Sequence, residues 1–307
     1  MLGGPPISRP IFRYNVTMPS LIPAHLDHGR VWQGFDYCYP VISRRSRGLS
    51  LGVNLNLDQV CNFDCVYCEV DRKNPPNRTD IDLGQLEDEM KALIELAISK
   101  ELFWVGPFSM AKIEHQRFND LAFSGNGEPT AAAQFTEAVH VLAGLRNRFG
   151  LNDIKLVLIT NATRFQDARA IEGIDALMEN NGEIWAKLDT GTEKLYGAIN
   201  RSSVPYNQII DNLIFAGKRW PLVIQTLLLD WSGSPPPPHE IQQYINKVKY
   251  LLDSGTQIKG LHLYTAARPT PMPMAKPLSS VILDEIACSI KDEIPNVPLD
   301  VFYGPTA

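Results

Sequence analysis

The sequence predicts an α/β protein whose core is one parallel sheet covered by helices. From about residue 49 onward, short apolar runs alternate with amphipathic segments, and each apolar run is continuous rather than alternating with polar residues. Strands covered on both faces are apolar throughout, and parallel strands joined by helices have this property. The 307 residues are enough for one large domain with a sizeable core.

Each expected element follows from a local pattern. Six apolar runs are expected to be strands: residues 49–55, 121–123, 154–159, 184–188, 222–229 and 258–264. Five segments between them have the spacing of a helix with one apolar face: 85–100, 135–149, 167–179, 206–219 and 239–252. Gly150 ends the second of these helices and Pro205 begins the fourth, which are their usual positions.

The two ends of the chain differ from this regular middle. Residues 1–48 show little periodicity and are rich in proline, glycine and aromatic residues, so we expect an extended segment that packs on the core. Residues 49–268 are expected to form the core itself. Residues 269–307 are expected to be a C-terminal extension, with a helix near 279–291 and a strand near 299–303. Six parallel strands joined by helices imply right-handed crossovers.

Composition places the chain among ordinary soluble globular proteins, with 44% hydrophobic and 21% charged residues. It has no run of 18 or more apolar residues, so we expect no transmembrane helix and no membrane partner. Residues 1–10 lack an apolar core of the secretory type. Free cysteines indicate a reducing compartment, and we expect the protein to be cytoplasmic.

Charge is distributed unevenly along the chain. The formal net charge of −5 argues against a general binder of polyanions. Residues 1–60 nevertheless hold six arginines against three aspartates, a net charge of 6 − 3 = +3. Three of these arginines form the run Arg44, Arg45 and Arg47. This run either binds a phosphate or carboxylate group or belongs to a solvated loop.

The cysteines carry the most specific chemical signal. Cys61, Cys65 and Cys68 have the spacing C-x3-C-x2-C, and three such thiolates can hold three irons of a four-iron cluster. With no fourth cysteine nearby, the fourth iron is left open to a small molecule. Structural zinc is the alternative, but it usually needs four ligands in two pairs, and Cys38 and Cys288 stand alone. An odd number of crowded cysteines disfavours disulfides.

Polar residues follow the expected strands, and the carboxyl ends of parallel strands are where α/β folds bind ligands. The second strand leads into a turn in which two glycines allow a close approach of backbone to ligand; its residues are Ser124, Gly125, Asn126, Gly127 and Glu128. Thr160 and Asn161 follow the third strand and either bind a ligand or cap the next helix.

Later strand ends carry further candidates. Lys187 and Asp189 are expected on one face of the fourth strand, either as a structural pair or in contact with a ligand. Arg201 is suited to a bidentate contact with a carboxylate. Gln225 lies within an apolar strand and needs a partner there. His262, in the sixth strand, is either a satisfied core histidine or a functional one.

These motifs together resemble a known enzyme superfamily. The first strand LGVNL, the cysteine run CNFDCVYC, the turn SGNGEPT and the sixth-strand end LYTAARP resemble the radical S-adenosylmethionine (SAM) superfamily, and within it the tRNA-modifying wyosine-base synthase-like group. The matches run from about residue 43 to about residue 270. Two departures are visible: Asn126 separates the two glycines, and only Cys38 precedes the cysteine run, where the true synthase has further cysteines for a second cluster.

The resemblance implies a fold: a (β/α)6 partial barrel, with an N-terminal extended segment and a short C-terminal α/β addition. It also implies that Cys61, Cys65 and Cys68 hold a 4Fe-4S cluster, whose open iron binds S-adenosylmethionine. A one-electron reductant of the flavodoxin or ferredoxin type would then drive cleavage to a 5′-deoxyadenosyl radical, which abstracts hydrogen from an unidentified substrate. RNA, with tRNA first, is one substrate class; a small molecule or peptide is another. A non-enzymatic iron–sulfur or zinc protein is the third hypothesis.

Roles for individual residues follow from the same resemblance. The residues expected to contact the cofactor are Tyr67, Ser124, Gly125, Asn126, Gly127, Glu128, Thr160, Asn161 and Gln225. The residues expected to take part in catalysis are Lys187, Asp189 and Arg201.

Overall fold

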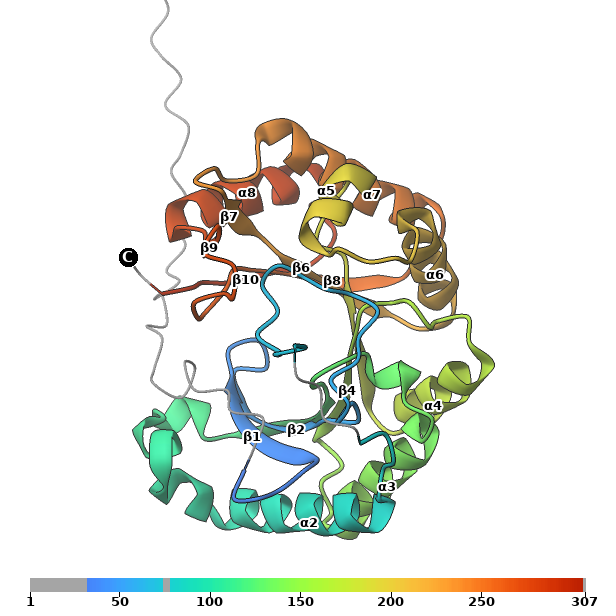
Figure 1. The fold of residues 1–307 in the computed structure, drawn as a ribbon, viewed down its shortest axis with the longest axis vertical. Helices are drawn as coiled ribbons and strands as arrows, with labels where there is room; N and C mark the ends of the chain where they lie inside the picture. The colour runs from blue at the N-terminus through green and yellow to red at the C-terminus, as the bar shows by residue number, and fades with distance from the viewer. Residues whose placement is uncertain (1–31, 74–77, 306–307) are drawn as a thin grey trace, which may run out of the picture.

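The computed structural model describes residues 32–73 and 78–305, with an eight-stranded sheet at their centre. The sheet curls into an open barrel, and helices form an arc around its outer face (Figure 1). In sheet order the strands are β1 (Cys38–Ser43), β2 (Gly48–Val53), β3 (Phe118–Phe123), β4 (Lys155–Thr160), β5 (Gly182–Lys187), β6 (Leu222–Leu227), β8 (Ile258–Tyr264) and β10 (Leu299–Phe302). All neighbouring pairs are parallel except β1 and β2.

Helices connect the parallel strands as the sequence predicts. They are α2 (Leu83–Ser99), α3 (Phe135–Arg148), α4 (Ala168–Glu179), α5 (Glu193–Ile199), α6 (Tyr206–Arg219), α7 (Pro238–Asp253) and α8 (Ser280–Glu293). Short 3-10 turns lie at η1 (Glu101–Trp104), η2 (Gly106–Met110), η3 (Ile113–His115) and η4 (Pro129–Ala131). The predicted α/β fold with a partial barrel is confirmed. None of the helices described is both long enough and apolar enough to span a membrane.

Three features of the fold were not expected from the sequence. The segment predicted as extended chain contains β1, which pairs antiparallel with β2, while residues 1–31 lie outside the described part. The helix α5 is too short to show a clear period. The apolar run 222–229 divides at its end: β6 stops at Leu227, and β7 (Leu229–Trp231) leaves the barrel to pair with β9 (Ala275–Pro277).

The β1–β2 hairpin also connects the two edges of the open barrel. At its turn, Arg47 forms an ion pair of 2.7 Å with Asp300 of β10. Beside it, Arg44 donates hydrogen bonds to the backbone carbonyls of Tyr303 and Thr265, which follow β10 and β8. The arginine-rich turn therefore reaches from one edge strand to the other and borders the barrel interior.

Strand β1 is held in place by one buried carboxylate. Glu89 of α2 is 6% exposed and accepts hydrogen bonds from the backbone N–H groups of Asp36 (3.0 Å), Tyr37 (2.8 Å) and Cys38 (3.0 Å). Asp36 and Tyr37 precede β1 and Cys38 is its first residue, so the sheet cannot satisfy all three groups. Buried backbone donors without a partner are costly. The carboxylate therefore fixes the entry of the chain into the sheet.

We expect Glu89→Ala to lower the free energy of unfolding by about 3 kcal/mol or more, because it leaves several buried N–H groups unpaired. Urea denaturation followed by circular dichroism measures this. The control is Glu87→Ala in the same helix, whose exposed ion pair with Arg148 should contribute about 0.5 kcal/mol or less. Equal effects of the two substitutions would contradict the proposed anchoring of β1.

Candidate active site

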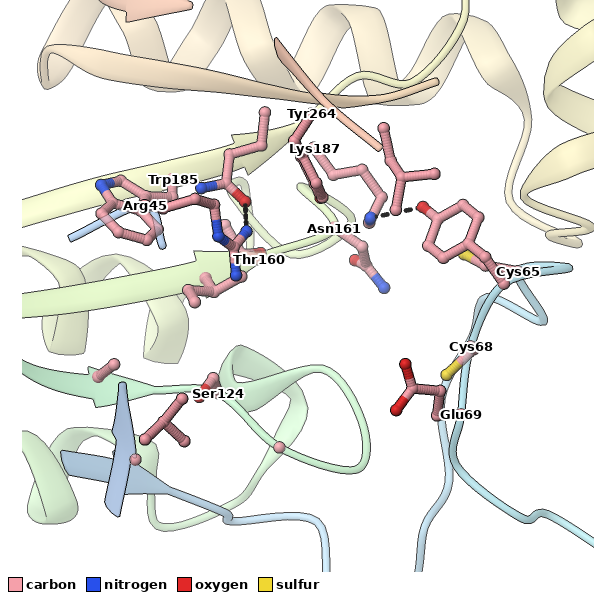
Figure 2. A pocket seen from close by; sticks show the side chains of 18 of the residues that line it. Arg45, Cys65, Cys68, Glu69, Ser124, Thr160, Asn161, Trp185, Lys187 and Tyr264 are labelled. Carbon is pink, nitrogen blue, oxygen red and sulfur yellow. Dashed lines mark hydrogen bonds between the residues drawn. The ribbon is translucent and has the colours of Figure 1, made fainter. Parts of the chain in front are cut away.

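A cavity of about 320 Å³ lies inside the curled sheet and opens at the carboxyl ends of its strands. Residues from most of the barrel strands line it, together with the loop that follows β2. Figure 2 shows Cys65 and Cys68 on one side of this cavity and Arg45 and Trp185 on the other. Of the predicted site residues, the following line the cavity: Cys61, Cys65, Tyr67, Cys68, Ser124, Gly125, Gly127, Glu128, Thr160, Asn161, Lys187 and Gln225.

The cysteine loop is held against the end of α5. The backbone N–H groups of Asp64 and Val66 donate to the carbonyls of Asn200 (3.1 Å) and Ile199 (2.9 Å). Phe63 packs edge-on against Tyr196 of α5, with ring centroids 5.6 Å apart. Backbone and side-chain contacts thus fix a loop that has no regular secondary structure.

Each of the three cysteine sulfurs receives a side-chain hydrogen bond from a different part of the chain. Arg72 Nη1 lies 3.1 Å from the Sγ of Cys68. Asn200 Nδ2 lies 3.6 Å from the Sγ of Cys65, and Asn161 Nδ2 lies 3.8 Å from the Sγ of Cys61. Donors of this kind stabilise negative charge on sulfur.

The thiols fit a multi-iron cluster. No group of three His, Cys, Asp or Glu side chains in the described residues could hold one metal ion, which is compatible with a cluster because each thiolate then binds a different iron. Burial raises the pKa of Cys65 to about 11 and also raises the pKa of Cys61. The metal-free thiols of Cys61 and Cys65 are therefore protonated at neutral pH, and binding of a metal there would release their protons.

The glycines of the turn after β3 have a packing role that the sequence did not predict. A Cβ atom on Gly125 would overlap Asn54, and one on Gly127 would overlap the carbonyl oxygen of Val60. Both glycines are therefore required where the turn packs against the segment that leads into the cysteine loop, and both also line the cavity. Asn126 does not line the cavity; its N–H donates to Asn54, and its carbonyl accepts from Arg72.

Glu128 connects the ends of β3 and β4. Its buried carboxylate accepts hydrogen bonds from the hydroxyls of Thr130 (2.6 Å) and Thr160 (2.7 Å) and from the backbone N–H of Asn161 (2.7 Å). The Asn161 side chain in turn donates to Asn62 Oδ1 (2.6 Å) in the cysteine loop. These contacts orient the cavity-lining groups at two neighbouring strand ends.

A second buried carboxylate, Asp189, organises the opposite side. It accepts hydrogen bonds from Asn200 Nδ2 (2.6 Å), from the backbone N–H of Leu227 (3.0 Å) and from the Tyr67 hydroxyl. Lys187 Nζ donates to the Tyr67 oxygen (2.7 Å) and lies 3.6 Å from Asp189. Burial alone would lower the pKa of Lys187, but the attraction of Asp189 outweighs it and raises that pKa, so the amine is protonated.

The remaining predicted residues lie behind the cavity, at the surface and in the cavity lining. Asp189 lies behind the cavity lining rather than in it, because β5 ends at Lys187 and the alternation stops there. Arg201 does not line the cavity; its guanidinium lies 3.6 Å from Asp64 and 3.7 Å from the Met272 sulfur. Gln225 lines the cavity and accepts a hydrogen bond from Arg45.

Two functional candidates were missed by sequence reasoning. Asn200 is buried between Cys65 and Asp189, whereas its neighbour Arg201 was selected because of its charge. Arg72 follows Cys68 by four residues, and proximity to the cysteine run was the signal that could have identified it.

The packing of the turn after β3 can be tested by substitution of a glycine. We expect Gly127→Ala to lower the free energy of unfolding by about 1–3 kcal/mol, because the added methyl group overlaps the Val60 backbone. Gly144→Ala is the control: this helical glycine has open space around its Cβ position and should be neutral or slightly stabilising. Thermal unfolding of both variants checks the difference, and a neutral Gly127→Ala would contradict the packing role.

Comparison with known proteins agrees with this geometry. The model of the Radical SAM superfamily matches residues 55–230. The chain is 24% identical to "GTPase Obg" of Brachyspira hyodysenteriae over 273 residues, which are 84% of this chain and 35% of that protein. It is 28% identical to "UPF0026 protein MJ1312" of Methanocaldococcus jannaschii over 180 residues, 58% of this chain and 47% of that protein. The chain thus spans between a third and a half of the length of these relatives.

Two solved structures share the fold. One is the structure of TYW1 with a lysine-pyruvate adduct bound (TM-score 0.51, 16% identity, 82% of this chain and 74% of that one). The other is Streptococcus suis SuiB bound to S-adenosylmethionine (TM-score 0.55, 14% identity, 83% of this chain and 51% of that one). Since the superfamily match covers more than half of the sequence and the fold is the partial barrel, the chain belongs to the radical SAM superfamily, whose enzymes use a 4Fe-4S cluster and S-adenosylmethionine.

Proposed function

We propose that this protein cleaves S-adenosylmethionine reductively and uses the resulting radical to abstract hydrogen from a substrate held inside the barrel. The observation that carries the proposal is the shared cavity: three cysteine thiols and the polar ends of β3, β4, β5 and β6 line the same space. A cofactor bound at the cysteine loop would thus face a substrate in the barrel interior.

Cys61, Cys65 and Cys68 would each hold one iron, leaving the fourth iron free. When bound, the cluster and S-adenosylmethionine together supply one-electron cleavage of the sulfonium carbon–sulfur bond, giving methionine and a 5′-deoxyadenosyl radical. Arg72, Asn161 and Asn200 hold the sulfurs by hydrogen bonds and so orient the ligands. An external one-electron reductant of the flavodoxin or ferredoxin type completes the electron balance.

For the cofactor we propose contacts with Tyr67, Ser124 and the backbone around Gly125–Glu128, together with Thr160 and Asn161. Buried carboxylates already fix several of these groups, which reduces the cost of ordering them on binding. Tyr67 is held by Asp189 and Lys187, so its ring is oriented beside the cysteine loop.

Lys187 is proposed to act as a fixed positive charge. Its amine is protonated and hydrogen-bonded to Tyr67, and a protonated amine cannot attack a carbonyl group. The TYW1 structure has a lysine-pyruvate adduct bound. Such an adduct on Lys187 would first require loss of this proton, so we do not extend that chemistry to this chain. Arg201 remains a predicted catalytic residue with no support from its position.

For the substrate class, our proposal rests on the sequence resemblance. The tRNA-modifying group that the motifs resemble makes RNA the first class to test, with a small molecule second. We further propose a cytoplasmic protein with an N-terminal segment at 1–48, a core at 49–268 and an extension at 269–307, in which the two flanking segments add β1 and β10 to the sheet of the core.

The reaction class has a direct test. We expect Cys65→Ala to abolish both cluster assembly and cofactor cleavage, because one iron loses its ligand. The measurement is anaerobic: reconstitution with iron and sulfide, addition of dithionite and S-adenosylmethionine, and quantification of 5′-deoxyadenosine by mass spectrometry. Cys288→Ala, an exposed cysteine outside the cavity, is the control and should retain cleavage. Retained cleavage in Cys65→Ala, or bound zinc without iron in the wild type, would refute the assignment.

The contact between Arg72 and Cys68 should raise the reduction potential of a bound cluster. Arg72→Gln removes a positive charge and a sulfur hydrogen bond, which disfavours the extra electron, so we expect the midpoint potential to fall by roughly 60 mV for a contact of about 1.5 kcal/mol. A redox titration followed by electron paramagnetic resonance measures it. Arg148→Gln, on the outer surface of α3, is the control. An unchanged potential with an intact cluster would exclude this role.

A further inference from the structure

The charges around the cavity are unbalanced. Five basic side chains line it (Arg44, Arg45, Arg72, Lys187 and Arg268), against two acidic ones (Glu69 and Glu128). The whole chain, by contrast, has a net charge of −5. A basic cavity in an acidic protein attracts anions, because low-dielectric walls concentrate the field there.

Three of the five cations have partners that carry or can carry negative charge. Arg268 pairs with Glu69 at 2.7 Å, Lys187 lies 3.6 Å from Asp189, and Arg72 donates to the sulfur of Cys68. The partners found for Arg44 and Arg45 in the described part of the chain are neutral. Arg44 donates to two backbone carbonyls, and Arg45 donates to the amide oxygen of Gln225.

The guanidinium of Arg45 is held in a defined position. It lies between two aromatic rings, 5.3 Å from the centroid of Trp185 and 5.1 Å from that of Tyr264. Stacking and the bond to Gln225 fix the plane of the guanidinium at low entropic cost. A guanidinium with a fixed plane presents parallel N–H donors, which match the oxygens of a carboxylate or phosphate group.

Neighbouring groups supply no negative charge to Arg45 through an ion pair. His262 contacts Gln225 at 3.4 Å, and burial together with the charge of Arg45 lowers its pKa to about 4, so the imidazole is neutral. The nearby Asp120 is buried, which raises its pKa to about 6, so it is mostly ionised at neutral pH and attracts Arg45. Its carboxylate accepts a hydrogen bond from Ser50 at 2.5 Å, and in the described part of the chain it forms no ion pair with Arg45. Arg44 and Arg45 repel one another, and an anion between them would relieve that repulsion.

We propose that Arg45, with Arg44 beside it, makes a bidentate contact with an oxyanion group of the substrate, carboxylate or phosphate. This contact lies across the cavity from the cysteine loop (Figure 2), so it would place the rest of the substrate toward the cofactor. The assignment rests on the proposed function, to which it adds a substrate class: a small anionic molecule, or a substrate with an anionic group that enters the barrel.

Calorimetric titration of the reconstituted full chain with inorganic phosphate, and separately with malonate, tests the contact and distinguishes the two oxyanions. At least one is expected to bind, and Arg45→Gln should raise its dissociation constant about tenfold or more. Arg47→Gln is the matched control: it removes the same charge from the same turn, but its side chain pairs with Asp300 outside the cavity and should change the constant less than about twofold.

Three results would overturn the proposal: no binding of either anion to the wild type, equal effects of Arg45→Gln and Arg47→Gln, or displacement of the anion by S-adenosylmethionine, which would assign the arginines to the cofactor. If Arg45→Gln fails to fold, Arg45→Lys replaces it. That variant keeps the charge but loses the parallel donors, so wild-type affinity in it would exclude a bidentate contact.

Measuring anion binding and 5′-deoxyadenosine production on the same protein sample distinguishes a failure of this inference from a failure of the proposed function. A wild type that produces 5′-deoxyadenosine but binds neither anion would refute the role of Arg45 alone. A wild type that binds the anion through Arg45 but never cleaves S-adenosylmethionine would refute the reaction class and leave an anion-binding barrel.

Discussion

The arrangement of the site depends on the hydrogen bonds that converge on the Asp189 carboxylate. Four parts of the chain meet there: the cysteine loop through Tyr67, the residue that follows α5 through Asn200, the end of β5 through Asp189 itself and the end of β6 through Leu227. A buried carboxylate must be paired or fully hydrogen-bonded to remain charged. That requirement couples the geometry of the cysteines to the opposite side of the barrel.

On the other side of the cavity, the Glu128 carboxylate likewise connects separate parts of the chain by hydrogen bonds. It connects the turn after β3 with Thr160 and Asn161, and Asn161 continues the network into the cysteine loop. The loop 61–68 is thereby held from both sides without regular secondary structure of its own. Polar networks of this kind are stable only when every member is satisfied, so single substitutions within them are expected to have effects beyond the residue replaced.

The barrel is open, and arginines of the β1–β2 turn connect its two edge strands. Arg44 and Arg47 reach from the hairpin turn to β10, and Arg45 between them enters the cavity. One turn thus contributes both to joining the edges and to the charge of the interior. This explains how a chain of net charge −5 can present a basic surface to a substrate.

The sequence by itself determined the parallel α/β core, the cysteine run after its first parallel strand and most polar strand ends, because these features depend on short-range spacing and on the apolar pattern of buried strands. It also suggested an oxyanion for the arginine run, with a solvated loop as the more usual alternative. Only the tertiary structure decided that β1 joins the sheet, that Asn200 rather than Arg201 contacts a cysteine, and that Arg45 lies between Trp185 and Tyr264. Those outcomes depend on contacts between residues up to 219 positions apart (264 − 45 = 219), which no local pattern encodes.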